Sequence, residues 1–214
     1  LHATDGGSDS LSGALRAALE FVQRIMTSDL PSLRVSCGGS VRPSVVILSD
    51  AAWRPVQGSV LGAGDVAWVV WFPPEDGQAS RTLFAAARVP DRMMRRLAEL
   101  RPQKLFITAL EEIALAAPYF HDEMRRGLQG RHVIHFADNQ AANCAAIKGY
   151  SSAPDLARLI GALQVRWALD SVCVWIEFVK SGANLADDPS RGDTRILRQL
   201  GAEEVGFIFP PLDG

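Results

Sequence analysis

The sequence predicts an α/β domain built on one five-stranded mixed sheet: three antiparallel strands, then two parallel strands, with helices on both faces. Three apolar segments follow one another over short connections, which is typical of an antiparallel meander. Two further apolar segments alternate with helical ones, which is typical of parallel βαβ units. A hydrophobic fraction of 48% in 214 residues is enough for one such core.

The three meander strands are expected at residues 44–49, 65–72 and 80–89, where apolar and β-branched residues dominate. The first of them, SVVILS, is apolar almost throughout, as in a strand buried on both faces, and it ends at Asp50. Residues 51–64 contain one proline and three glycines, so they are predicted to form a loop.

Apolar residues at helical spacing predict the remaining architecture. Helices are expected at residues 91–100, at 103–117 with a stop near Pro118, at 154–169, and at 187–200 as a closing helix. The two parallel strands are expected at residues 171–179 and 131–137, the latter directly before an alanine-rich helix that ends at Gly149.

The sequence also predicts three parts of unequal size. Residues 1–43 are expected to hold an appended helix at residues 11–27 and a connector rich in Pro and Gly. Residues 44–200 are expected to form the α/β domain, and residues 201–214 a C-terminal tail. Because the chain begins at Leu1 rather than Met, we expect it to be a segment of a longer polypeptide.

Charge and cysteine content narrow the class of protein. The 22 basic and 24 acidic residues nearly balance, so any nucleic-acid contact must come from a local basic face rather than from net charge. Cys37, Cys144 and Cys173 are odd in number and far apart, which favours a reduced intracellular protein of the cytoplasm or nucleus over a disulfide scaffold. No apolar run is long enough for a membrane span, so no membrane partner is expected.

Acidic residues stand at four points where strands end or helices lie. Asp50 follows the first strand, Glu111 lies within the second helix, Asp138 follows the fourth strand, and Asp187 begins the last helix. Each alone has an ordinary explanation, such as a turn, a solvated helix face, an N-cap or a favourable helix-dipole contact. Their neighbours leave two choices open: Glu112, expected to face solvent, beside Glu111, and Asp188 beside Asp187.

Taken together, these four acids predict a metal site at one edge of the sheet. Four hard oxygen ligands without a His or Cys cluster suit Mg²⁺ or Mn²⁺ rather than zinc. Two such ions about 3.5–4 Å apart activate a water and stabilise the leaving oxygen of a phosphodiester.

Four motifs carry a family resemblance: SDAAW at residues 49–53, ITALEEIA at 107–114, FADNQAA at 136–142 and NLADDPSR at 184–191. They resemble the motifs of ribonuclease H domains of retroelement reverse transcriptases, over roughly residues 44–199. The resemblance implies a ribonuclease H-like fold. It also implies that Asp50, Glu111, Asp138 and Asp187 are the catalytic residues and hold two Mg²⁺ ions.

The same resemblance implies the reaction and its partners. The expected activity is endonucleolytic hydrolysis of the RNA strand of RNA–DNA hybrids during retroelement reverse transcription, leaving a 3′-hydroxyl and a 5′-phosphate. A reverse transcriptase module in the same polypeptide is the expected partner, with residues 1–43 as the tail of a polymerase module. Residues 180–183 lack the histidine that many ribonucleases H carry in this loop.

Four residues near the acids are expected to contact nucleic acid. Arg191 shares a motif with Asp187, and Arg195 follows it at helical spacing. Asn139 is next to Asp138, and Trp53 lies in the segment after Asp50. His135 falls within a predicted strand, so we expect a packed core histidine rather than a ligand.

Two other functions remain open from the sequence. One is a different ribonuclease H-like nuclease or polynucleotidyl transferase that acts on DNA. The other is a catalytically silent ribonuclease H-like scaffold that binds nucleic acid. The presence of all four acids argues against the silent scaffold.

Overall fold

In a computed structural model, the described residues are 42–75, 77–100, 102, 106–151 and 153–211, together with Arg16, Glu20 and Gln23. The chain divides into two compact units, Leu1–Ser32 and Leu33–Gly214. The helix expected at residues 11–27 lies outside the described residues, apart from Arg16, Glu20 and Gln23, which are helical. The connector expected after it is also outside them up to residue 41.

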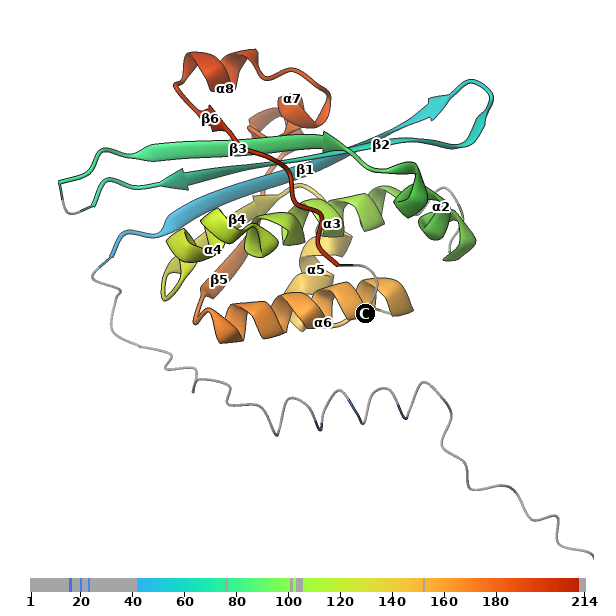
Figure 1. The fold of residues 1–214 in the computed structure, drawn as a ribbon, viewed down its shortest axis with the longest axis horizontal. Coiled ribbons are helices and arrows are strands. Elements are labelled where there is room, and N and C mark those ends of the chain that lie inside the picture. The colour runs from blue at the N-terminus through green and yellow to red at the C-terminus, as the bar shows by residue number, and fades with distance from the viewer. Residues whose placement is uncertain are drawn as a thin grey trace, which may run out of the picture. The chain divides into compact units, whose positions relative to one another are not determined.

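The second unit is built on a six-stranded sheet in the order β5-β4-β1-β2-β3-β6 (Figure 1). Its strands are β1 Val45–Val56, β2 Ser59–Phe72, β3 Arg81–Arg88, β4 His132–Ala137, β5 Cys173–Phe178 and β6 Glu203–Glu204. β1, β2 and β3 are antiparallel, whereas β4 is parallel to β1 and β5 is parallel to β4. The predicted mixed sheet, with three antiparallel strands followed by two parallel strands, is therefore confirmed. The sixth, short strand lies in the stretch expected as a tail.

Helices cover both faces of this sheet (Figure 1). One face carries α2 Asp91–Leu100, α3 Phe106–Phe120, α4 Asp122–Leu128, α5 Gln140–Lys148 and α6 Pro154–Leu169. The other carries α7 Asp187–Ser190 and α8 Arg195–Gln199, which follow the short 3-10 helix η2 Ser181–Ala183. The sequence did not predict α4. No helix among the described residues is both long and apolar enough to cross a lipid bilayer.

The core is divided by the sheet into a large and a small cluster. Alternate residues of a strand point to opposite faces, so Ile47 packs into the large cluster and Leu48 against the small one. The large cluster joins the sheet to α2–α6 through side chains such as Trp68 and Leu110. The small cluster joins it to the α7–α8 segment through Phe84 and Leu197.

The loop predicted at residues 51–64 is wrong, because these residues extend β1 and β2 into a long hairpin. Gly58, with φ of 79°, supplies the turn. Gly64 lies within β2, where it packs closely against α3, since a Cβ there would come within 2.9 Å of Leu110. Pro55 falls at the register shift between Arg54 and Val56, where a strand tolerates a missing N–H. Gly58 thus forms the turn of the hairpin, whereas Gly64 permits close packing rather than a loop.

Two predictions about α3 also need correction. The helix does not stop near Pro118 but continues to Phe120, and Pro118 and Tyr119 are both buried in it. Glu112 does not face solvent, since only 1% of it is exposed. The reason is that α3 packs against β1 and β2 on one side and α6 on another, which leaves this helix without an open face.

The single closing helix predicted at residues 187–200 is wrong as well. The segment forms two short helices, α7 and α8. Gly192 between them has φ of 87°, a left-handed conformation that ends a right-handed helix. The break turns the chain after α7, and α7 itself lies against β1 and β2.

Candidate metal centre

The register of two parallel strands places Asp50 beside Asp138. Ser49 of β1 and Ala137 of β4 are the last paired residues of these strands, and Asp50 and Asp138 are the next residues of each. β4 ends there, whereas β1 continues and pairs Asp50 with Ala67 of β2. Both acids therefore lie at the carboxyl edge of β4, as expected from the sequence.

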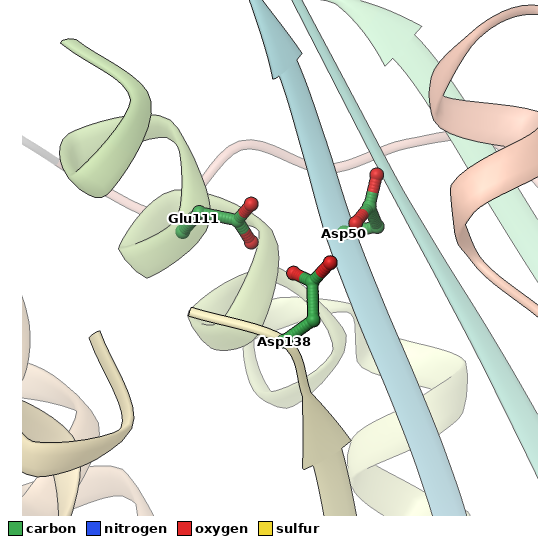
Figure 2. Close-up of side chains that lie close together, drawn as sticks. All are labelled: Asp50, Glu111 and Asp138. Atoms are coloured by element: carbon green, nitrogen blue, oxygen red, sulfur yellow. The ribbon is translucent and has the colours of Figure 1, made fainter. Parts of the chain in front are cut away.

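Glu111 approaches the same point from α3. Each of Asp50, Glu111 and Asp138 has a carboxylate oxygen within 4.8 Å of those of the other two. Figure 2 shows the three side chains converging from β1, α3 and the end of β4. This spacing suits one shared cation, because each oxygen that binds an ion lies about 2.0–2.6 Å from the centre of that ion.

The charges of this cluster are poorly solvated. Burial, followed by repulsion from Asp50 and Asp138, raises the pKa of Glu111 to about 9. Burial is also the largest cause that raises the pKa of Asp50 to about 7, while a hydrogen bond with Ser190 opposes it. Glu111 Oε2 is buried without a hydrogen-bond donor in the described part of the chain. A divalent cation would supply the missing positive charge, so these residues fit the predicted Mg²⁺ or Mn²⁺.

Asp138 is not needed as a helix cap. Asn139 is the N-cap of α5, and its Oδ1 accepts hydrogen bonds from the backbone N–H groups of Ala141 and Ala142, both at 3.1 Å. The Ser181 hydroxyl donates a hydrogen bond to Asp138 Oδ2. The division of roles leaves the Asp138 carboxylate directed toward the cluster, as Figure 2 shows.

Asp187 lies near the three clustered acids but is not one of them. Its charge contributes to the raised pKa of both Asp50 and Glu111, which places it within electrostatic reach. Its Oδ1 accepts hydrogen bonds from Arg191 Nε at 3.1 Å and Nη2 at 2.8 Å. Its neighbour Asp188 is exposed. The role of Asp187 as a fourth ligand stays a prediction.

Two buried residues without a predicted role connect the α7 segment to β1. Asn184 Nδ2 donates to the carbonyl oxygen of Ser49 at 2.9 Å, and its Oδ1 accepts from Ala186 N at 3.1 Å. The Ser190 hydroxyl donates its proton to Asp50 Oδ2, and the Asp187 carbonyl oxygen lies 2.8 Å from the same hydroxyl oxygen. Both residues belong to NLADDPSR, so the motif itself was the signal that sequence reasoning left unused.

His135 is the packed core histidine that the sequence predicts. It is fully buried, and its ring nitrogens bond the Tyr119 hydroxyl at 3.0 Å and the Ser49 hydroxyl at 2.9 Å. Burial lowers its pKa to about 3, so the ring is neutral at physiological pH. Through Ser49, it supports the backbone just before Asp50.

The four residues expected to contact nucleic acid lie in different settings. The Arg191 and Arg195 side chains are 65% and 85% exposed, and Arg195 is paired with Asp193. Asn139 uses its Oδ1 in the cap described above. Trp53 is half-buried, packs edge-on against Phe106 and donates from Nε1 to the Leu61 carbonyl at 3.1 Å. These contacts give Trp53 a structural role, and nucleic-acid contact by all four stays a prediction.

No protein-family model and no curated sequence matches this chain. Among solved structures, it is similar to RNase H1 from the halophilic archaeon Halobacterium salinarum, with 18% identity, a TM-score of 0.41, and coverage of 69% of this chain and 93% of that one. It is also similar to the N-terminal RNase H domain of a Mycobacterium tuberculosis protein, with 18% identity, a TM-score of 0.47, and coverage of 74% and 99%. A third similar structure is LC11-RNase H1 in complex with RNA/DNA hybrid, with 10% identity, a TM-score of 0.43, and coverage of 72% and 99%.

Proposed function

We propose that this chain is a metal-dependent endonuclease that hydrolyses the RNA strand of RNA–DNA hybrids. The observation that carries the proposal is the convergence of Asp50, Glu111 and Asp138 at one edge of the mixed sheet. The motifs around these residues, which resemble those of retroelement ribonuclease H domains, support the choice of substrate. The same likeness supports a role in reverse transcription, beside a reverse transcriptase module in the same polypeptide.

The proposed cofactor is a pair of Mg²⁺ ions, with Mn²⁺ as a substitute. Asp50, Glu111 and Asp138 would hold them, with Asp187 as the fourth ligand. When bound, such ions lower the pKa of a nucleophilic water and stabilise the leaving oxygen of a phosphodiester.

Other side chains position these ligands. Ser181 orients Asp138, and Ser190 bonds Asp50. Asn184 holds the start of the α7 segment on β1, so Asp187 and Asp50 approach each other from opposite ends of the domain sequence. Residues that orient metal ligands in this way typically change metal affinity by about 10–100-fold when they are replaced.

Cleavage assays with labelled hybrid, DNA duplex and RNA duplex test the proposal directly. In Mg²⁺, the wild-type chain is expected to cut only the RNA strand of the hybrid. Asp138→Asn is expected to lower the rate by at least about 100-fold, beyond the effect of losing an orienting residue. Asp122→Asn is the matched control, because this carboxylate is 83% exposed and lies on α4.

Each substrate gives a different answer. Cleavage of DNA duplex but not of hybrid would replace the proposal by a DNA nuclease or polynucleotidyl transferase. Binding of hybrid without any cleavage, in Mg²⁺ and in Mn²⁺, would indicate a silent scaffold.

A further inference from the structure

An open pocket of about 270 Å³ lies between the sheet and the α7–α8 segment. Arginines from three elements line it: Arg54 of β1, Arg88 of β3 and Arg191 directly after α7. Asp65 of β2 is the one acidic residue in the lining. The three arginines and Asp65 give the lining residues a net charge of +2, and Asp187, the partner of Arg191, lies outside the lining.

The pocket adjoins the candidate metal centre through two of its lining residues. Ser190 lines the pocket and bonds Asp50, and Arg191 lines it and bonds Asp187. Arg191 is also the only lining arginine whose partner belongs to the proposed ligand set.

The sheet register gives the spacing between pocket and centre. Asp50 pairs with Ala67, and Ala67 pairs with Ala86, so Ala86 in the pocket lies two strands away from Asp50 in the same row. Two strand spacings amount to roughly 10 Å. Successive phosphates of one strand advance about 3.4 Å along the duplex axis, so one duplex can reach both places within a few nucleotides.

Asp65 holds two of the guanidinium groups in place. Its Oδ1 accepts from Arg88 Nε at 3.0 Å, and its Oδ2 accepts from Arg54 Nη1. The Asp65 side chain is 15% exposed, whereas those of Arg54 and Arg88 are 48% and 56% exposed. A guanidinium carries five N–H donors, and each of these bonds uses one. One carboxylate therefore orients two arginines without neutralising both.

We propose that this pocket binds a backbone phosphate of the nucleic-acid substrate, a few nucleotides from the phosphodiester at the metal centre. The inference rests on the proposed function. Arginine forks match phosphate oxygens bidentately, and two arginines already oriented by Asp65 lose little side-chain freedom on binding. The small residue Ala86 leaves room for the phosphate between β3 and α7. Arg54 and Arg88 thus join Arg191 in holding the substrate.

The test measures hybrid affinity at several salt concentrations, with every variant built on Asp138→Asn so that the substrate stays intact. Arg54→Gln and Arg88→Gln, made singly, are each expected to weaken binding about 3–10-fold. Each is also expected to reduce the slope of log K against log[salt] by about 1, the value for one lost phosphate contact. Arg88→Lys should keep the slope, because the charge remains. Arg158→Gln, an exposed arginine on α6, is the matched control and should change neither quantity.

Two outcomes would overturn the proposal. The first is a slope that stays unchanged in both Arg54→Gln and Arg88→Gln while thermal unfolding shows that the variants are folded. The second combines two results. Free inorganic phosphate shifts the arginine side-chain signals in an NMR titration, yet the arginine substitutions leave the salt dependence of hybrid binding unchanged. That result would make the pocket a site for free anions. Failure of the proposed function looks different, because the wild-type chain would then not cut hybrid, whatever the salt slope.

Discussion

Asp50 accepts a hydrogen bond from Ser190, a residue 140 positions later in the chain. This contact joins the first strand of the domain to the short helix that carries Asp187. Asn184 supports the same junction through the Ser49 carbonyl. The candidate centre is therefore closed by contacts between the two ends of the domain sequence, and its geometry depends on the α7 segment staying in place.

Ser190→Ala removes this junction without adding bulk. We expect the free energy of unfolding to fall by about 1–3 kcal/mol, because a buried carboxylate loses its donor. Metal affinity should fall by about 10–100-fold. Urea denaturation and calorimetric titration with Mn²⁺ measure the two effects. Ser80→Ala, at an exposed position directly before β3, is the control, and equal behaviour of the two variants would contradict the positioning role.

Asp187→Asn and Asp188→Asn separate the two neighbouring acids. Asp187 is within electrostatic reach of Asp50 and Glu111, whereas Asp188 is exposed. We expect Asp187→Asn to lower hybrid cleavage in Mg²⁺ by at least about 100-fold, and Asp188→Asn to stay within about twofold of wild type. Steady-state rates of cleavage decide between them. The reverse pattern would move the fourth ligand to Asp188.

The stability of the metal-free protein should depend on pH through Glu111 and Asp50. Their pKa values rise on folding from 4.5 to about 9 and from 3.8 to about 7. At pH values between the unfolded and the folded pKa of each group, the folded state therefore binds more protons than the unfolded state. The free energy of unfolding thus falls as pH increases. The stabilising contribution of the two protonated carboxyl groups is fully present below about pH 4. It is lost as pH rises through about 7 for Asp50 and about 9 for Glu111.

Urea denaturation in EDTA between pH 5 and 9 measures this dependence. The expected change is on the order of a few kcal/mol, since one unit of pKa corresponds to about 1.4 kcal/mol. Glu111→Gln should flatten the curve, because the amide does not titrate. Saturating Mg²⁺ should also oppose the trend, because ligation requires deprotonated carboxylates. Stability that rises with pH in EDTA would contradict the buried carboxyl cluster.

Gly64→Ala tests the close approach of the hairpin to α3. The added Cβ would come 2.9 Å from Leu110 Cδ1 and 3.0 Å from the Met94 sulfur. We expect a loss of about 1–3 kcal/mol in the free energy of unfolding. Because Leu110 precedes Glu111, metal affinity should fall as well. Gly206→Ala is the control, since nothing lies within 4 Å of a Cβ at that position and its φ is unstrained. Unchanged thermal unfolding of Gly64→Ala would show that α3 adjusts freely.

Local patterns in the sequence were sufficient for the sheet and for two of the acids. Apolar runs mark β1, β2, β3, β4 and β5. Short connections predict antiparallel neighbours, and helical connections predict parallel ones. Asp50 and Asp138 each follow such a run. Once β1 and β4 are parallel and adjacent, no other information is needed to bring these two carboxylates together.

Local patterns gave wrong predictions for the conformation or exposure of residues whose surroundings in the fold, rather than the direction of the chain, determine these properties. Gly62 and Gly64 were predicted to be loop residues, but they lie in β2, and they are glycines because the indole of Trp53 and the side chain of Leu110 occupy the space that a Cβ would fill. Glu112 was expected to face solvent, yet α3 is packed on opposite sides and buries both glutamates. A sequence pattern identifies each residue but not the side chains that pack around it in the folded chain.

The sequence by itself thus determined the order and direction of the predicted strands and the convergence of Asp50 with Asp138, because these follow from local hydrophobic runs. Only the tertiary structure decided that Glu111 rather than Glu112 completes the cluster, since helical phase alone leaves both open. It also decided the bond from Ser190 to Asp50 and the gathering of Arg54, Arg88 and Arg191 around one pocket. The partners in these contacts come from separate strands and helices, and only packing of the folded chain brings them within reach.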